Sequence, residues 1–272
     1  MSSIAALTPV GRLRVTQPRV VLSEWTKLRS LRSTLWSLFV AIVLGIGLPC
    51  LFGAVTSSHW GGMSPHERAD RHPLDIALAG VNIAQLAIGV LGVLIITGEY
   101  STGMIRATMS AVPKRLPVLW AKAGVFGAVT FVLMLPTVLI AFFASQAIIS
   151  HIEPLKTSLS SPGVTRAVIG GALYLSVLGI FCLALGAIVR NTAGGIAVFA
   201  GIFFVIPPLL NILPTSWNNA VSPYLPDAAG RDVFSLTTGA HDLSHWAGFG
   251  LFCGYAAAAV GIAAVLLRRR DV

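Results

Sequence analysis

The stretch LWSLFVAIVLGIGLPCLFGAV, residues 35–55, decides the fold class of this chain. It contains no charged side chain, and about 20 apolar residues in a helix are enough to cross a hydrocarbon core about 30 Å thick. Further apolar runs of comparable length follow it. The sequence therefore predicts an all-α integral membrane protein with six transmembrane helices. The expected spans are 35–55, 76–97, 118–149, 168–189, 195–213 and 246–267.

The composition of the whole chain agrees with this prediction. Of its 272 residues, 55% are hydrophobic and 11% are charged, whereas a soluble domain carries about 25% charged residues. The formal net charge is +9, but the basic side chains flank the apolar runs and form no stripe interleaved with aromatic rings. The positive charge therefore indicates contact with a membrane surface, and no nucleic-acid partner is expected.

The distribution of lysine and arginine predicts the orientation in the membrane. If the amino terminus is inside, the outer segments hold only a minority of the basic residues, namely Arg68, Arg71, Lys156, Arg166 and Arg231. Because lysine and arginine concentrate on the cytoplasmic side of membrane proteins, both termini are expected in the cytoplasm. The chain is then a multi-pass protein of the inner, cytoplasmic membrane of the cell.

Composition divides the chain into three parts. Residues 1–34 form a basic cytoplasmic segment, residues 35–267 form the transmembrane domain, and residues 268–272 form a cytoplasmic tail. The transmembrane domain includes a cytoplasmic loop at 98–117 and a long, partly apolar outer segment at 214–245. A segment of the latter kind can rest on the membrane, or enter it where protein shelters its backbone.

The end of the basic segment has the pattern of an interfacial helix. Residues 19–35 are compatible with a helix, and Val21, Trp25 and Leu28 fall on one stripe of it while Arg29 lies off that stripe. This pattern predicts a helix on the inner leaflet whose basic groups face anionic lipid. The alternative is a plain cytoplasmic extension of the first span.

No GxxxxGK[ST] sequence occurs in the chain. In P-loop ATPases the glycine-rich backbone of this motif and its lysine hold the nucleotide phosphates. We therefore expect that the chain does not hydrolyse ATP, that it carries no cofactor and that it is not an enzyme on its own.

A weak metal-site pattern is present in the stretch HDxxH at 241–245. On a helix, His241 and His245 would share one face, which suits two imidazoles on one metal ion. A third ligand and a catalytic carboxylate are not evident, and histidine is ordinary at a boundary between water and membrane. A membrane-embedded metalloenzyme is therefore an alternative interpretation, and no metal is expected.

The second predicted span carries a polar and small-residue arc. Asn82, Gln85, Gly89 and Gly92 lie close together on one side of a helix. Such an arc lines a pathway or packs against another helix, and packing is slightly favoured. In the sixth span, the row formed by Gly250, Gly254 and Ala258 predicts helix packing.

The predicted spans contain few ionisable groups near their centres. Ion-coupled carriers usually need such groups to relay protons or to pair with ions. The sequence therefore argues against a secondary transporter, which stays an alternative, as does a membrane sensor or immunity component that transports nothing.

The loop at 98–117 is the segment with the most informative pattern. If the second helix continues past Glu99, Arg106 falls on the same face, and prolines then restart the chain into the third span. Apolar side chains on a short cytoplasmic helix suggest that it inserts into a groove of a partner protein; an anchor on the inner leaflet is the alternative. The candidate contact residues are Glu99, Tyr100, Met104, Ile105, Arg106 and Met109.

Three stretches resemble a known family. They are SEWTKLRSLRST at 23–34, EYSTGMIRATMSAVPKR at 99–115 and YLPDAAG at 224–230. Together with the six-span layout, they make the chain look like a permease subunit of an ABC-2 type transporter.

This resemblance implies six helices preceded by an interfacial helix, and a dimer of this chain with a second copy or a homologue. It implies that separate ATPase subunits bind ATP and magnesium, and that residues 99–115 form the coupling helix that contacts them. Residues 214–245 would form outer helices. The expected function is ATP-driven transport across the lipid bilayer, namely export of an amphipathic or hydrophobic small molecule such as a drug, an antibiotic or a lipid-like compound.

Overall fold

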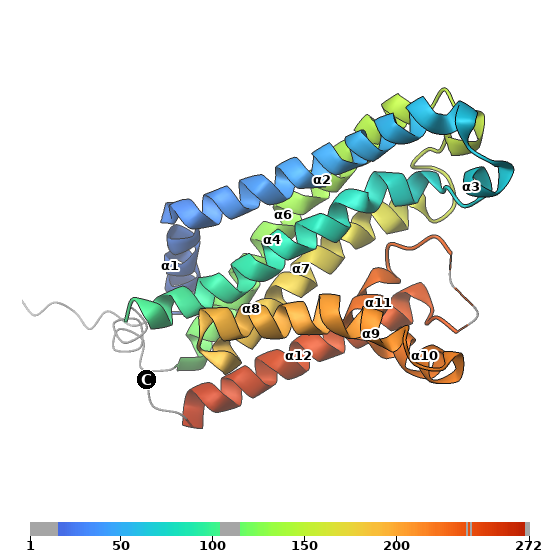
Figure 1. Ribbon diagram of the computed structural model, residues 1–272. Coiled ribbons are helices and arrows are strands. Elements are labelled where there is room, and N and C mark those ends of the chain that lie inside the picture. The colour runs from blue at the N-terminus through green and yellow to red at the C-terminus, as the bar shows by residue number, and fades with distance from the viewer. Residues whose placement is uncertain (1–15, 104–114, 238, 240, 270–272) are drawn as a thin grey trace, which may run out of the picture.

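The computed structural model describes residues 16–103, 115–237, 239 and 241–269. Within these residues the chain is helical and contains no strand. Long helices lie side by side in a bundle, and short helices gather at its two ends (Figure 1). We call these the α1 end and the α3 end of the bundle.

Within the described residues, six segments are long and apolar enough to span a membrane, as the sequence predicted. The architecture is therefore that of a multi-pass membrane protein. Each segment begins and ends within a few residues of its expected bounds. The segments are α2 (Arg32–His59), α4 (Pro73–Ser101), α6 (Arg115–Ile149), α7 (Val164–Val189), the succession α8 (Thr192–Ala200), η3 (Gly201–Val205) and α9 (Ile206–Leu210), and α12 (His245–Arg269).

The helix α7 forms the centre of the bundle. It packs against α4, α6 and α12, and it has the largest buried share of the six segments. Glycines permit these close contacts: a Cβ atom on Gly186 would lie 3.0 Å from the backbone oxygen of Val93 in α4, and one on Gly179 would lie 2.8 Å from the ring of Phe126 in α6. Tyr174, in the middle of α7, is fully buried.

The helices α2 and α4 cross through a backbone contact. A side chain on Gly80 of α4 would overlap the carbonyl group of Gly45 in α2. Pro49 lies four residues after Gly45 and has no N–H group, so it cannot make the helical hydrogen bond to the Gly45 oxygen. That oxygen is therefore free to face Gly80, where a weak Cα–H···O contact can satisfy it.

The helix α1 (Gln17–Ser30) crosses the end of the bundle and meets α2 at Leu31, whose backbone is extended (Figure 1). It has three different faces. Val20, Glu24 and Leu28 are buried against the bundle, whereas Val21, Leu22 and Trp25 are apolar and exposed. The remaining face is polar and exposed, and it carries Arg19, Ser23, Thr26 and Ser30. The predicted helical stripe is thus divided, because Leu28 packs inward while Val21 and Trp25 stay outside.

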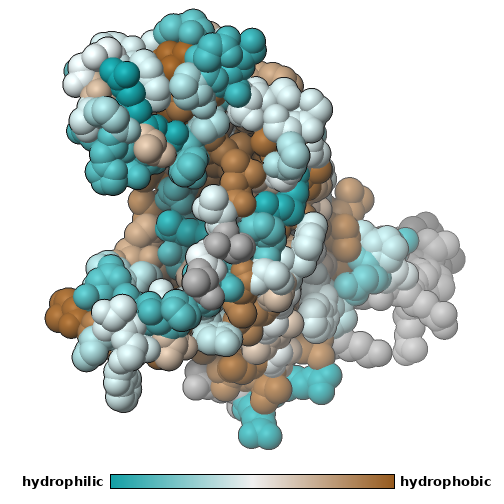
Figure 2. Space-filling view, turned by 90° about the vertical axis from the view of Figure 1, so that its right-hand side faces the viewer, coloured by the Kyte–Doolittle hydropathy of each residue, from teal (hydrophilic) through white to brown (hydrophobic). Residues whose placement is uncertain are grey.

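Short helices gather at the α3 end, the opposite end of the bundle (Figure 1). They are α3 (Pro65–Ala69), η2 (Glu153–Leu155), α10 (Thr215–Val221), η4 (Ser222–Tyr224) and α11 (Pro226–Arg231). The side chain of Ser64 accepts from the backbone N–H of Glu67, and the Glu67 carboxylate accepts from the Ser64 N–H, so a capping box fixes the start of α3. Hydrophilic side chains are prominent on this end of the molecule (Figure 2).

The α11 helix reaches inside the bundle rather than lying over its end. Its Gly230 packs on the ring of Tyr174, where a Cβ atom would lie 2.6 Å from the ring. Tyr174 lies about 15 Å along α7 from the start of that helix, at 1.5 Å per residue. The predicted outer segment 214–245 therefore includes a helix that enters the bundle.

The predicted packing of the small-residue row on α12 does not occur within the described part of this chain. The row of Gly250, Gly254 and Ala258 on α12 is exposed, and a Cβ atom on either glycine would meet nothing within 4 Å. The helix packs on α7 and α11 with its other face, which carries Gly248, Phe252 and Ala256.

Candidate functional site

Four charged side chains meet at the α1 end of the bundle, and we call them the charge cluster. They are Glu24 and Lys27 of α1, Glu99 of α4 and Lys122 of α6. The Lys27 Nζ atom lies 2.7 Å from Glu24 Oε1 and 2.9 Å from Glu99 Oε1. The Lys122 Nζ atom lies 2.5 Å from Glu24 Oε2 and 2.9 Å from Glu99 Oε1. The cluster therefore ties three helices together.

The charge cluster is buried but electrically balanced. The side chains of Glu24, Glu99 and Lys122 are 3%, 8% and 4% exposed, so water screens them little. Burial works against the charge on Lys27, but the carboxylates of Glu24 and Glu99 prevail and raise the pKa of its ammonium group above the ordinary value. Each lysine contacts both carboxylates, which is the arrangement that makes buried charges tolerable.

The charge cluster flanks the segment 104–114. Glu99 lies just before this segment and Lys122 lies shortly after it. Of the predicted contact residues, Met104, Ile105, Arg106 and Met109 lie outside the described residues. Tyr100 is half-buried, and the guanidinium carbon of Arg190 lies 5.3 Å from the centre of its ring. Arg190 ends α7 with a left-handed backbone (φ 57°), so α7 also contributes to this end of the bundle.

A second polar network lies inside the bundle toward the α3 end. The Tyr174 hydroxyl lies 2.5 Å from Gln85 Oε1 and 3.3 Å from Asp227 Oδ1. The Nε atom of Arg231 donates to the same Asp227 oxygen at 2.9 Å. Gln85, Tyr174 and Asp227 are all buried. This network connects α4 and α7 to the inserted helix α11.

The single hydroxyl proton of Tyr174 can serve only one of these acceptors at a time. If the Gln85 amide is turned over, its NH₂ group donates to the tyrosine oxygen and the tyrosine donates to Asp227, so every bond has a donor. Burial raises the pKa of Asp227 above its ordinary range, although Arg231 and the Tyr174 hydrogen bond favour the carboxylate.

The predicted arc on α4 lies at helix contacts for three of its four residues. Gln85 bonds to Tyr174 of α7, and Gly89 lies against the ring of Phe199 in α8. A Cβ atom on Gly92 would lie 2.6 Å from the Gly179 backbone oxygen of α7. Asn82 differs from these three, because its buried Oδ1 atom has no hydrogen-bond partner in the described part of the chain.

We expect the two polar residues of this arc to differ in their effect on stability. Replacing Gln85 with leucine should lower the free energy of unfolding by about 1 kcal/mol, because it removes a buried hydrogen bond. Replacing Asn82 with leucine should leave that free energy unchanged or raise it, because no bond to Oδ1 is lost. Denaturant unfolding of both variants in the same detergent tests the difference, and equal losses would contradict it.

The two histidines of the HDxxH stretch do not lie on one helix. The helix α12 begins at His245, and His241 lies in the preceding turn. The Nδ1 atom of His245 is 2.8 Å from the Asp232 backbone oxygen, and the Asp242 carboxylate accepts from the Gly239 N–H at 2.7 Å. Among the described residues, no group of three or more His, Cys, Asp or Glu side chains is placed to hold a metal ion.

Asp232 is a half-buried carboxylate in the same region. Burial and the nearby Asp242 raise the pKa of its carboxyl group to about 6. The folded state thus binds this proton more tightly than the unfolded state, where an aspartate has a pKa of about 3.9. Its stabilising contribution is complete below that value and is lost as the pH rises through about 6.

We therefore expect the Asp232→Asn variant to be less sensitive to pH than the wild type. Between pH 5 and pH 8 the wild type should lose about 1 kcal/mol of unfolding free energy that the variant keeps, since Asp232 is only half-buried and water screens its charge. Thermal unfolding in detergent across this pH range measures the difference. Parallel curves for the two proteins would show that Asp232 does not titrate as inferred.

Several residues of these two networks were not among the predicted site residues. They are Glu24, Lys27, Lys122, Tyr174, Asp227 and Arg231. Two sequence signals pointed toward them: the charged pair Glu24 and Lys27 lies in SEWTKLRSLRST, and Asp227 lies in YLPDAAG. Lys122 lies inside an apolar helix, and a buried cation of that kind requires a carboxylate partner.

Comparison of the sequence with models of known protein families and with curated proteins finds no match.

Proposed function

We propose that this chain is the membrane-spanning permease subunit of an ATP-driven, ABC-2 type exporter of the cytoplasmic membrane, with both termini in the cytoplasm. The observation that carries the proposal is the charge cluster. It joins α1 to α4 and α6, the two helices that the segment 104–114 connects in sequence, and we expect that segment to contact an ATPase.

The arrangement suits the transmission of force from a partner. In sequence, the segment 104–114 connects α4 to α6, and the charge cluster holds both of these helices to α1. A push on this segment would therefore move three helices together. Because buried ion pairs depend strongly on geometry, they resist independent sliding of the helices that carry them.

Two exposed surfaces support assembly with a second permease copy. The segment from α8 to α9 has only 17% of its most apolar window buried inside the chain. The small-residue row of α12 is also open, and such rows let helix backbones approach closely in membranes. A dimer would cover surfaces of this kind, and an amphipathic or hydrophobic substrate would travel along the apolar surfaces that remain.

The test is ATP-driven transport by a purified complex. A tagged chain should co-purify from its own cells with an ATPase that carries a Walker A motif, and liposomes containing both should move a hydrophobic dye only when ATP is present. The Glu99→Ala and Ile105→Asp variants should lose at least about ten-fold in transport while still inserting into the membrane. Co-purification of the ATPase with each variant measures docking separately from transport.

The Ser58→Ala variant is the control for these two. Ser58 is exposed near the end of α2 at the opposite end of the bundle, and its hydroxyl donates to the Val55 carbonyl group of its own helix. Its transport should equal that of the wild type. Transport driven by an ion gradient without the ATPase would favour a secondary transporter, and wild-type coupling in both Glu99→Ala and Ile105→Asp would exclude this loop as the coupling element.

A further inference from the structure

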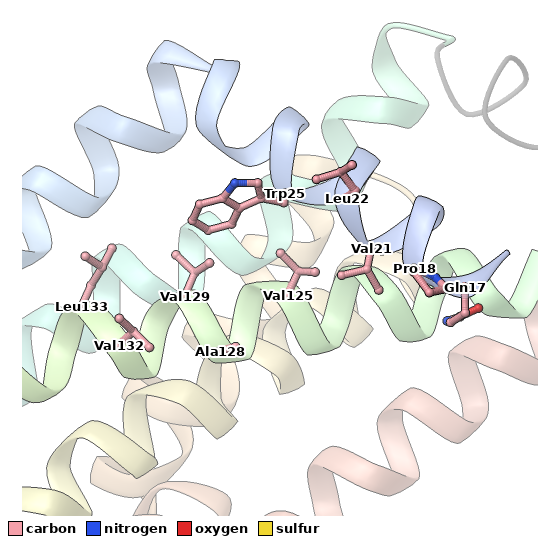
Figure 3. A pocket seen from close by; sticks show the side chains of 10 residues that line it. All are labelled: Gln17, Pro18, Val21, Leu22, Trp25, Val125, Ala128, Val129, Val132 and Leu133. Carbon is pink, nitrogen blue, oxygen red and sulfur yellow. The ribbon is translucent and has the colours of Figure 1, made fainter.

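An apolar groove lies between α1 and α6, with a volume of about 720 Å³. One side is formed by side chains of α1, and the other by side chains of α6. Figure 3 shows α1 crossing α6 while Trp25 reaches along the groove toward Val129. The lining residues are Gln17, Pro18, Val21, Leu22, Trp25, Val125, Ala128, Val129, Val132 and Leu133.

The groove exists because one face of α6 carries small side chains where α1 crosses it. Gly124 and Ala128 are exposed and lie one turn apart, and a Cβ atom on Gly124 would meet nothing within 4 Å. Val132 follows a turn later and is 65% exposed. This face belongs to a helix long and apolar enough to span a membrane, so its natural surroundings are hydrocarbon.

The α1 side of the groove is also apolar, although α1 carries charges elsewhere. Leu22 is 64% exposed and Trp25 is 45% exposed, and both line the groove. Indole rings concentrate where a membrane meets water. The apolar face of α1 thus turns toward a membrane. The groove that it lines is apolar, so it suits the acyl chain of a lipid better than water.

A cation completes this face of α1. Arg29 follows Trp25 by four residues, so the two side chains share one helix face, and the sequence-based expectation that Arg29 lies off the stripe of Trp25 is wrong. Arg29 is exposed and forms no ion pair within the described residues. The nearby carboxylates of Glu24 and Glu99 are both engaged by Lys27 and Lys122. An arginine on an apolar, membrane-facing side of a helix needs an anion, and the phosphate of a lipid is the anion that a membrane surface supplies.

We propose that this groove binds one anionic phospholipid, with an acyl chain between α1 and α6 and the headgroup phosphate on Arg29. The proposal does not depend on transport or on an ATPase partner; only the assignment to the inner leaflet rests on the proposed function. A lipid in this position would hold α1 against α6, and α1 carries Glu24 and Lys27 into the charge cluster. Anionic lipid would therefore stabilise the charge cluster that joins α1, α4 and α6.

The test uses Trp25 as a fluorescent reporter in the full-length chain. The other tryptophans, at positions 36, 60, 120, 217 and 246, are replaced with phenylalanine, and the protein is placed in vesicles that contain either brominated phosphatidylglycerol or brominated phosphatidylcholine in an unlabelled mixture of both. Bromine quenches a ring that it touches. The anionic lipid should compete about five-fold better for the position beside Trp25, as one arginine at a membrane surface allows.

Three variants identify the groove as the origin of this preference. Arg29→Gln should reduce the five-fold preference to about one-fold, and Arg29→Lys should retain part of it, since lysine keeps the charge. Ala128→Phe should fill the floor of the groove and weaken quenching by both brominated lipids. Size-exclusion chromatography checks that each variant is folded. If Ala128→Phe is not folded, the two Arg29 variants alone test the proposal.

Matched controls come from α12. Arg269→Gln removes an exposed arginine from the same end of the bundle, and Ala257→Phe enlarges an exposed alanine on an apolar helix. Neither should change the quenching of Trp25. Equal competition by the two lipids in the wild type would overturn the proposal, and so would a preference for anionic lipid that survives in Arg29→Gln.

Discussion

Replacing Lys122 with methionine should lower the free energy of unfolding by about 3 kcal/mol or more, because it leaves the charge cluster with one cation for two buried carboxylates. Glu24 and Glu99 are 3% and 8% exposed in their side chains, so water cannot take the place of the lost ammonium group. Denaturant unfolding in detergent micelles measures the loss, and the helical circular dichroism signal before unfolding checks that the variant has inserted its helices.

A double replacement separates charge from packing. Glu99→Gln alone should also destabilise the chain, whereas Glu99→Gln combined with Lys122→Met leaves Glu24 paired with Lys27 and should cost clearly less than the sum of the single changes. Lys156→Met is the matched control, since the Lys156 and Glu153 side chains are 62% and 86% exposed and such pairs contribute little. Strict additivity, or an equal loss in Lys156→Met, would show that the cluster does not act as a unit.

Replacing Gly80 with alanine should cost about 3 kcal/mol, because the new methyl group would overlap the carbonyl group of Gly45. A flexible side chain could move aside, but here the obstacle is the backbone of α2. The two helices must separate, and their packed surfaces lose contact. Thermal unfolding of the variant in detergent should show a clearly lower midpoint than that of the wild type.

Gly47→Ala is the matched control for this change. Gly47 lies in the same helix as Gly45, is exposed, and would have nothing within 4 Å of an added Cβ atom. Since alanine favours helix more than glycine does, this variant should be as stable as the wild type or more so. If Gly80→Ala is equally stable, the close crossing of α2 and α4 is not a determinant of the fold.

The number and limits of the long apolar helices could be predicted from the sequence because hydrocarbon thickness sets their length. The segments predicted at 76–97 and 168–189 correspond to α4 (Pro73–Ser101) and α7 (Val164–Val189). These helices extend beyond the apolar runs by a few residues, since polar residues near the ends are compatible with a helix as well. What surrounds each span does not alter this signal, so it is local and robust.

The contacts between helices could not be predicted in the same way. Glu24, Glu99 and Lys122 are far apart in sequence, and only the packing of α1 across α4 and α6 brings them together. The row of Gly250 and Gly254 has the same small-residue spacing as helix contacts elsewhere, yet it is open in this chain. Spacing shows which side of a helix can be approached closely, but not which helix approaches it.

The fifth apolar segment has a mechanical property that the other five lack. It changes from α8 into the π-helical turn η3 and then into α9, where Pro207 and Pro208 follow one another. Each proline removes a backbone N–H group, so carbonyl groups in the preceding turn lose their helical partners. With fewer helical hydrogen bonds and little support from neighbouring helices, this segment is expected to bend more easily than an uninterrupted helix. If the bundle changes shape along its length, we expect the bend to fall in this segment.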